Sequence, residues 1–438
     1  MMYDWANSAH SVIVVTLLPI FFDTVAGYTA DSVSSMSTWG YATSIAMAIV
    51  ALSAPFLGVF GDIRGMRKRL FALFVGIGVV AVALLSFTPM MDFMSSTAAA
   101  GRVAGLILAL YIVSVIGFDA SAIYYDAFLT DITTPERMDR VSTMGYGLGY
   151  IGGSTIPLVI FLLMNLAGVP MLTCLAVIFA ITAVWWLVFS LPLLKNCRQT
   201  SGKPYEKGDV GRSLRGVGAT VREIIANKPM LVYILAYFFY IDGVHTVISM
   251  ATTYGTNLGL DDTGMMLALL LVQILGLPFC LLYIRLAARF GARAMVGVGV
   301  CVYMFICVFA FFMRELWQFW LLAVLCATSQ GGIQALSRSM FGKLLPDKDR
   351  SGEFFGFFDI FGKFSSIMGP ALVGFVSALV ADRMLAEQGL TEATATAEQV
   401  DAINAASGPY GILSVLLIIL VGAVLYFFVL PKTLADKK

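Results

Sequence analysis

The chain has 438 residues, of which 59% are hydrophobic and only 13% are charged, and its formal net charge is +1. A soluble domain carries about 25% charged residues, so this composition excludes a soluble globular protein. The dispersed basic residues form no cluster that would suit nucleic acid, and we expect no such partner.

Apolar segments long enough to cross a bilayer recur from end to end. The first has no basic flank and no small-residue cleavage site, so we expect it to stay as a span rather than be removed as a signal peptide. The abrupt start at Met1-Met2 leads us to expect a few further residues upstream. The twelve predicted spans cover 4–26, 37–60, 69–88, 102–125, 142–164, 171–191, 229–251, 263–285, 294–313, 317–340, 354–380 and 409–430.

One long polar stretch, at 192–228, separates the sixth predicted span from the seventh. We therefore predict an all-α membrane protein with a six-helix bundle at 1–191, a linker at 192–228 and a second six-helix bundle at 229–438. The halves echo each other, since "PERMDRVS" follows the fourth span and "PDKDRSGE" follows the tenth. An internal six-plus-six repeat is typical of alternating-access transporters.

Basic residues predict the orientation, because cytoplasmic loops are enriched in Lys and Arg. With a cytoplasmic N-terminus, only Arg102, Arg314 and Arg383 of the 28 Lys and Arg residues fall outside, and Lys363 lies within a span. We expect an integral multi-pass protein of the bacterial cytoplasmic membrane, in contact with lipid, with both termini in the cytoplasm.

The loop "GVFGDIRGMRKR", between the second and third spans, combines glycines with an acid and a basic cluster. Its spacing resembles the G-x-x-x-D-x-x-G-x-R-K/R-R motif of the major facilitator superfamily. The glycines allow a tight turn, and the charges can bridge helices at the cytoplasmic mouth. We assign gating or structural roles to Asp62, Arg64, Gly65 and Arg67. The simpler alternative is a tight loop whose basic residues only reflect the enrichment of Lys and Arg in cytoplasmic loops.

Four further stretches narrow the resemblance: "YDWANSAH", "GYGLGYIGG", "YFFYIDGVHTVISMATTYG", and "GGIQALSRSMFGKLLP" with "EFFGFFDIFGKFSSIMGP". They resemble the vacuolar effluxer branch, whose eukaryotic members are similar to autophagy-linked amino-acid exporters. The chain departs from that branch at His10 and His245, where Tyr and Gln are expected. The resemblance implies that spans one, four, seven and ten line a central cavity.

Ionisable residues inside spans are costly and are functional candidates by default. Asp242 and His245 lie one helical turn apart in span seven, and we predict that they form a site for protons or for substrate. The alternative is a pair that neutralises itself. Asp119 and Asp126 share one face of span four; Asp119 is the deeper cavity candidate, and Asp126 suits a gate.

Two further sets of polar residues lie in other spans. Gln330 and Gln334 in span ten offer amides to a zwitterion, or else bond between helices. Asp359 and Lys363 in span eleven are spaced for an ion pair, which serves either as a gate or only in packing.

The stretch "YDWANSAH" places polar residues at the cytoplasmic end of span one. We expect Asp4 and Asn7 to be gate or helix-contact residues, and His10 to be a weaker pH-sensitive candidate. In span five, Gly145, Gly149 and Gly153 form a small-residue face for close helix approach.

We find no nucleotide-binding loop, catalytic triad or metal-ligand spacing, and the linker is too short for a nucleotide-binding domain. We therefore predict no enzyme, metal or cofactor, and a monomer. The predicted function is secondary active transport of a small polar organic solute such as an amino acid or short peptide, coupled to protons. The residues leave the direction of transport open, and the resemblance implies export. The alternatives are an amphiphile exporter and a non-transporting membrane sensor or assembly factor on a transporter scaffold.

Overall fold

The computed structural model describes residues 1–29, 35–204, 209–390 and 396–431, and this part of the chain is almost entirely helical. Its elements are α1 (Met2–Ala26), α2 (Ser35–Gly61), α3 (Met66–Leu85), η1 (Thr88–Met90), α4 (Thr97–Ile132), α5 (Pro135–Leu148), η2 (Gly149–Thr155), α6 (Ile156–Leu166), α7 (Met171–Asn196), α8 (Asp209–Ala226), α9 (Lys228–Asn257), α10 (Asp262–Phe290), α11 (Ala292–Phe311), α12 (Leu316–Leu344), η3 (Lys348–Arg350), α13 (Ser351–Glu387), α14 (Ala397–Val424) and η4 (Leu425–Val429).

Twelve helical segments of the described chain are long and apolar enough to cross a membrane, which confirms the predicted spans. The fifth is built from α5, the π-helical turn η2 and α6 as one span, Pro135–Leu166. The predicted linker also contains a helix, α8, whereas the sequence pattern predicted only a polar stretch there.

The chain divides into two compact units. The first comprises Met1–Val221 and Leu345–Ile360, and the second comprises Arg222–Leu344 and Phe361–Lys438. One boundary falls near the end of α8. The other falls inside α13, so the first turns of this helix belong to the first unit and the rest belongs to the second.

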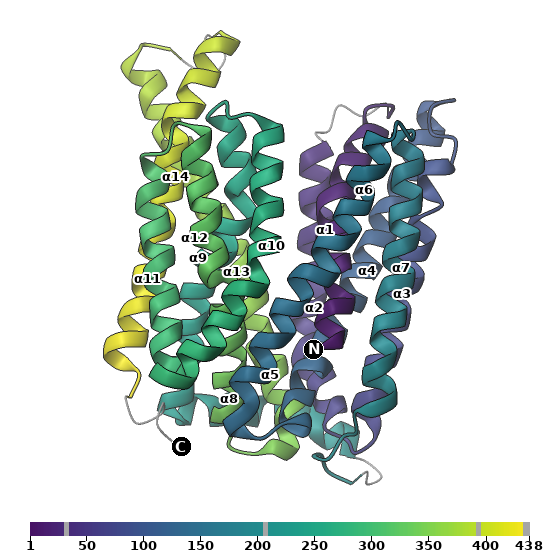
Figure 1. Cartoon of the computed structure of the whole chain (residues 1–438), viewed down its shortest axis with the longest axis vertical. Coiled ribbons are helices and arrows are strands. Elements are labelled where there is room, and N and C mark those ends of the chain that lie inside the picture. The colour runs from purple at the N-terminus through teal and green to yellow at the C-terminus, as the bar shows by residue number, and fades with distance from the viewer. Residues whose placement is uncertain (30–34, 205–208, 391–395, 432–438) are drawn as a thin grey trace. The chain divides into compact units, whose positions relative to one another are not determined.

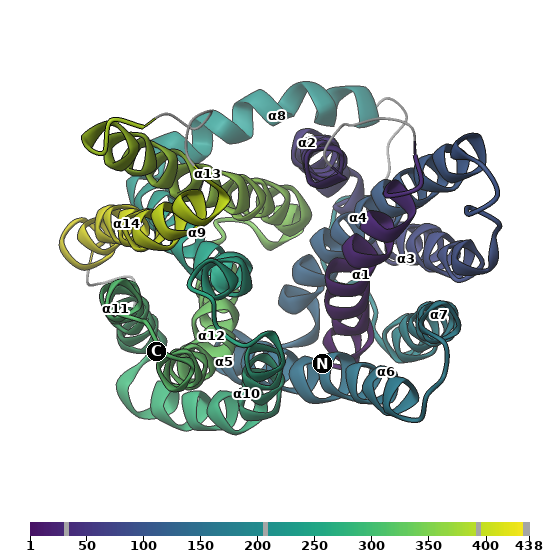
Figure 2. The same cartoon turned by 90° about the horizontal axis from the view of Figure 1, so that it is seen from above.

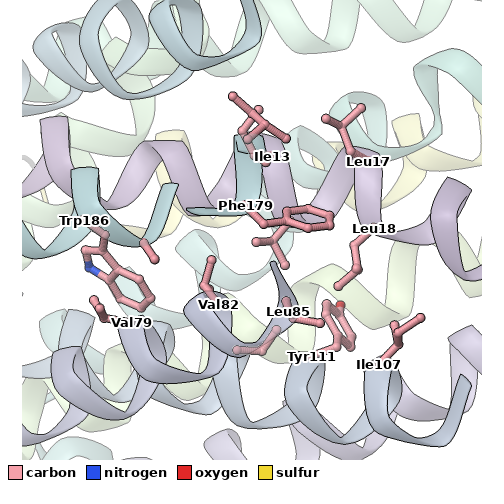
Figure 3. Close-up of a cluster of buried hydrophobic side chains, with 14 of the residues drawn as sticks. Ile13, Leu17, Leu18, Val79, Val82, Leu85, Ile107, Tyr111, Phe179 and Trp186 are labelled. Carbon is pink, nitrogen blue, oxygen red and sulfur yellow. The ribbon is translucent and has the colours of Figure 1, made fainter. Parts of the chain in front are cut away.

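In the first unit, α3 and α4 pack along each other, and α1 and α7 pack against them (Figure 1). Apolar residues spaced three or four apart on these helices face inward and form the core. Figure 3 shows Phe179 and Trp186 of α7 among the aliphatic side chains of α1 and α3. The labelled residues are all buried: Ile13, Leu17, Leu18, Val79, Val82, Leu85, Ile107, Tyr111, Phe179 and Trp186.

The glycine face of span five receives α1. A Cβ atom on Gly149 would lie 2.6 Å from the hydroxyl of Ser8, and one on Gly153 would lie 2.6 Å from the carbonyl of Trp5. A larger residue at either position would push α1 away, so the structural interpretation of this face is confirmed.

In the second unit, α9 packs against α14, and α12 packs against α10 and α11 (Figure 2). Gly243 lets α14 approach, because a Cβ atom there would lie 2.1 Å from Ile419 Cγ1. Tyr233 and Tyr240 of α9 both bond to Ser337 of α12, at 2.7 and 2.6 Å. These contacts hold the middle of α9 firmly inside its unit.

Candidate functional site

Two glycines bring the end of α2 against the start of α13 within the first unit. A Cβ atom on Gly58 would lie 2.2 Å from the carbonyl oxygen of Gly352, and one on Gly352 would lie 2.6 Å from that of Gly58. Only glycine permits such a backbone contact. Asp62, one turn after Gly58, is thereby placed next to the first turn of α13.

The carboxylate of Asp62 accepts three hydrogen bonds in a site where it is 7% exposed. The backbone N–H groups of Gly352 and Glu353 donate to it at 2.7 and 2.8 Å, and Arg67 Nη2 donates at 2.8 Å. Amides in the first turn of a helix have no acceptor within that helix and carry partial positive charge. Asp62 therefore caps the start of α13 from a different helix.

Arg67 lies fully buried at the centre of this cluster, and its guanidinium joins four segments of the first unit. It forms ion pairs with Asp62 at 2.8 Å and with Asp131, at the end of α4, at 2.6 Å. One cation thus lies between two carboxylates. Its remaining hydrogen-bond acceptors are Gly61 O, Ala127 O, Ser201 Oγ and Ser351 Oγ.

The segment after α7, residues 197–203, lies against this cluster. Asp131 Oδ1 accepts bonds from the backbone and hydroxyl groups of Thr200 and Ser201, at 2.7–3.1 Å. Gln199 Oε1 accepts from the amide of Gly65, whose φ of 83° forms the turn between α2 and α3. The start of the central linker is therefore part of the site.

A second ion pair lies where η3 meets the first turn of α13. Arg350 Nε donates to Glu353 Oε2 at 3.1 Å, and both side chains bond to the hydroxyl of Thr220 on α8. This contact gives α8 a role: it joins the linker to the first turn of α13.

Burial raises the pKa of Asp62 to about 7. Arg67 and the two α13 amides act in the opposite direction, because they stabilise the carboxylate. All three partners are donors, so the contacts suit the ionised form. We infer that the cluster is intact when Asp62 is charged and weakens when it takes up a proton.

Only part of this cluster is predictable from the sequence motif. The motif predicted Asp62 and Arg67, whereas the side chain of Arg64 is exposed at the turn. The motif did not predict the partners of Arg67 and Gly65, which are Asp131, Gln199, Ser201 and Ser351. Ser351 lies within the repeated segment "PDKDRSGE", and this repeat was the available signal for it.

Asp242 is fully buried near the middle of α9. Its Oδ1 accepts a hydrogen bond from the backbone N–H of Gly369 at 3.0 Å, immediately before Pro370 of α13. Its Oδ2 is buried and, among the described residues, has no hydrogen-bond partner, and the same holds for the hydroxyl of the buried Thr246. Because a Cβ atom on Gly369 would lie 3.0 Å from Asp242 Oδ1 and 1.8 Å from Thr246 Oγ1, both groups lie against Gly369.

Two predicted pairs of ionisable residues lie on α9 and α13. Within the described chain, Asp242 makes no ion pair with His245, and its bond goes to α13 instead. His245, one turn further along α9, is half-buried. The boundary between the units falls between Asp359 and Lys363, so a gate formed by that pair stays a prediction.

A cavity lies inside the second unit, between α9, α10, α11, α12 and α14. Gln330 lines this cavity together with Gln273 of α10, whereas Gln334 does not. The lining is otherwise almost wholly apolar, so the surroundings of Gln330 do not resemble a site for a zwitterion.

The polar residues of "YDWANSAH" bond to α4 inside the first unit. Tyr3 and Ser121 share a hydrogen bond of 2.6 Å, and the hydroxyl of Tyr125 donates to Asp4. His10 Nε2 lies 3.2 Å from Ser114 Oγ, and the imidazole stacks on Phe118. The stretch is a buried helix contact inside the first unit, on α4 and on the glycine face of span five.

The remaining candidates also lie in the first unit. Asn7 contacts Tyr3. On α4, Asp119 is 1% exposed, whereas Asp126 is half-buried. Since Asp119 and Asp242 lie in different units, their joint role in proton coupling stays a prediction.

Comparison with known proteins decides the family. The family model described as "Vacuole effluxer Atg22 like" matches residues 1–383. The chain belongs to the vacuole effluxer Atg22-like family. The Atg22-like chain is 42% identical over 386 residues to the uncharacterised MFS-type transporter YxiO of Bacillus subtilis, covering 86% of this chain and 87% of that one.

A more distant relative of this Atg22-like chain is Autophagy-related protein 22-1 of Penicillium rubens. It is 25% identical over 54% of this chain but over only 44% of its own length, so the chain spans under half of that fungal protein. The structure of the proton:xylose symporter XylE covers 99% of this chain and 94% of its own, with a TM-score of 0.69 at 13% identity. Together these matches confirm the predicted family and the major facilitator fold, and they identify a transporter rather than an enzyme.

Proposed function

We propose that this transporter exports a small polar organic solute, amino-acid-like or short-peptide-like, by alternating access coupled to protons. We place it in a bacterial cytoplasmic membrane with both termini in the cytoplasm. The family's description as an effluxer supports the direction, and the asymmetry of Lys and Arg supports the orientation.

The observation that carries the proton coupling is the environment of Asp242. A fully buried carboxyl group in the middle of a span, with one oxygen lacking a partner among the described residues, is costly in apolar surroundings. Its other oxygen holds the amide of Gly369. Protonation weakens that acceptor, so we propose that proton uptake alters the bond between α9 and α13.

The Asp62 cluster supports a gating role at one end of α13. This helix belongs to both units, and its first turn is held by Asp62, Arg67 and Thr220 in the first unit. Any movement of one unit relative to the other must therefore act on α13. We propose that release of its first turn accompanies each transport cycle.

The test is flux in proteoliposomes over amino acids, short peptides, sugars and amphiphiles, with and without a pH gradient. Amphiphiles are included because the apolar cavity of the second unit favours an amphiphile exporter as the second candidate. We expect Asp242→Asn to retain substrate exchange but to lose accumulation driven by the pH gradient. Asp23→Asn, at an exposed position on α1, is the matched control and should behave as wild type.

Unchanged gradient-driven accumulation in Asp242→Asn would refute the coupling. Flux of amphiphiles alone would refute the proposed substrate class. Absence of flux for every class would favour the remaining alternative, a membrane sensor or assembly factor.

A further inference from the structure

The cavity inside the second unit has properties that differ from those needed by the proposed cargo. We infer that it is a binding site for an uncharged amphiphile, whose apolar body fills the cavity and whose hydrogen-bond-donating head bonds to Gln273. This inference goes beyond the proposed function, because it assigns a second ligand to a site within one unit.

The cavity suits an apolar ligand. Its walls come from five helices, and most of the side chains concerned, such as Ile306, Met313 and Phe319, are otherwise buried. The apolar lining therefore favours an alkyl chain or a ring.

The charge of the lining excludes a zwitterion. None of the described residues that line the cavity is Asp, Glu, Lys, Arg or His. An ammonium or carboxylate group placed here would lose its hydration without gaining a counter-charge, which is strongly unfavourable. The ligand must therefore be neutral.

One polar atom specifies the head of the ligand. Gln273 Oε1 is buried and has no hydrogen-bond partner among the described residues. The hydroxyl of Tyr254, also in the lining, already donates to the carbonyl of Ala310 at 2.7 Å. A buried acceptor without a donor is costly, so a ligand that brings an N–H or O–H group satisfies it. Gln330 supplies a second amide to the same cavity.

The test measures binding, using the purified full chain in nanodiscs and two probes. Tritiated decanamide carries N–H donors, whereas N,N-dimethyldecanamide has the same apolar body and no donor. We expect saturable binding of decanamide. Ala323→Phe, which fills the cavity, should abolish it, whereas Val298→Phe, on an exposed part of α11, should leave it unchanged.

Gln273→Leu tests whether the head group of the ligand bonds to Gln273. It also tests the proposal if Ala323→Phe does not fold. It should weaken decanamide binding about five- to tenfold and leave the binding of the dimethyl probe unchanged. Absence of saturable binding, or equal effects of Gln273→Leu on both probes, would overturn the inference. This experiment measures binding and no flux, so its outcome does not affect the flux test of Asp242.

Discussion

Asp62 accepts a hydrogen bond from the backbone N–H of Gly352 at 2.7 Å, although 290 positions of sequence separate them. A second bond of the same kind joins Asp242 to the amide of Gly369. The first lies in one unit and the second in the other. Helix α13 is thus held in each unit by a carboxylate that accepts from its backbone, and both carboxylates are buried. We expect the charge on these two acids to control how firmly α13 is held.

Arg67→Ala should destabilise the protein by about 3–5 kcal/mol, because it leaves Asp62 and Asp131 buried without their shared cation. Arg67→Lys should recover little of the lost stability, since one ammonium group cannot donate to all the acceptors that the guanidinium reaches. The measurement is thermal unfolding in detergent. Arg64→Ala, at an exposed position in the same turn, is the control and should change stability by less than about 0.5 kcal/mol. Equal effects of the two alanine variants would contradict the role of Arg67.

Gly58→Ala should separate the end of α2 from the start of α13. The added Cβ atom would lie 2.2 Å from the carbonyl of Gly352, so the backbone must move, at a cost of about 1–3 kcal/mol. Gly76→Ala in α3 meets nothing within 4 Å and should stabilise its helix by about 0.5–1 kcal/mol. Hydrogen exchange of the Gly352 and Glu353 amides should rise only in Gly58→Ala. Unchanged exchange there would show that the contact does not position Asp62.

The sequence predicts the spans well because membrane insertion depends on local composition, which is readable residue by residue. It also predicts Asp62 and Arg67, because their motif is contiguous. It does not predict Asp131 or Ser351 as their partners, because these contacts arise only when distant helices pack. For the same reason, the sequence left Asp4 as either a gate or a helix-contact residue and made His10 a pH-sensitive candidate, whereas in the structure both bond to α4. Helix α8 was missed because its polar composition resembles a loop.

The hold on α13 should weaken as pH falls through about 7, where burial places the pKa of Asp62. A protonated carboxyl accepts more weakly and no longer pairs with Arg67, so the Gly352 and Glu353 amides should exchange faster at pH 6 than at pH 8, after correction for intrinsic rates. Because this pKa lies above that of an exposed carboxyl, the folded chain binds the proton more tightly than the unfolded chain. From this group alone, the free energy of unfolding therefore decreases as pH rises from about 4 to about 7. Asp62→Asn should remove the pH dependence, and its persistence there would assign it to another group.

Thr246→Val separates stability from transport in the second unit. The Thr246 hydroxyl is fully buried and has no partner among the described residues, so an isosteric apolar side chain should leave stability unchanged or raise it by up to about 1–2 kcal/mol. If the hydroxyl serves the proton or the substrate near Asp242, flux in proteoliposomes should nevertheless fall. Ser249→Ala, one turn further along α9, is the control, because its hydroxyl already donates to the carbonyl of Thr246. Unchanged flux in a stabilised Thr246→Val protein would show that this hydroxyl takes no part in transport and would leave Asp242 as the only polar group assigned there.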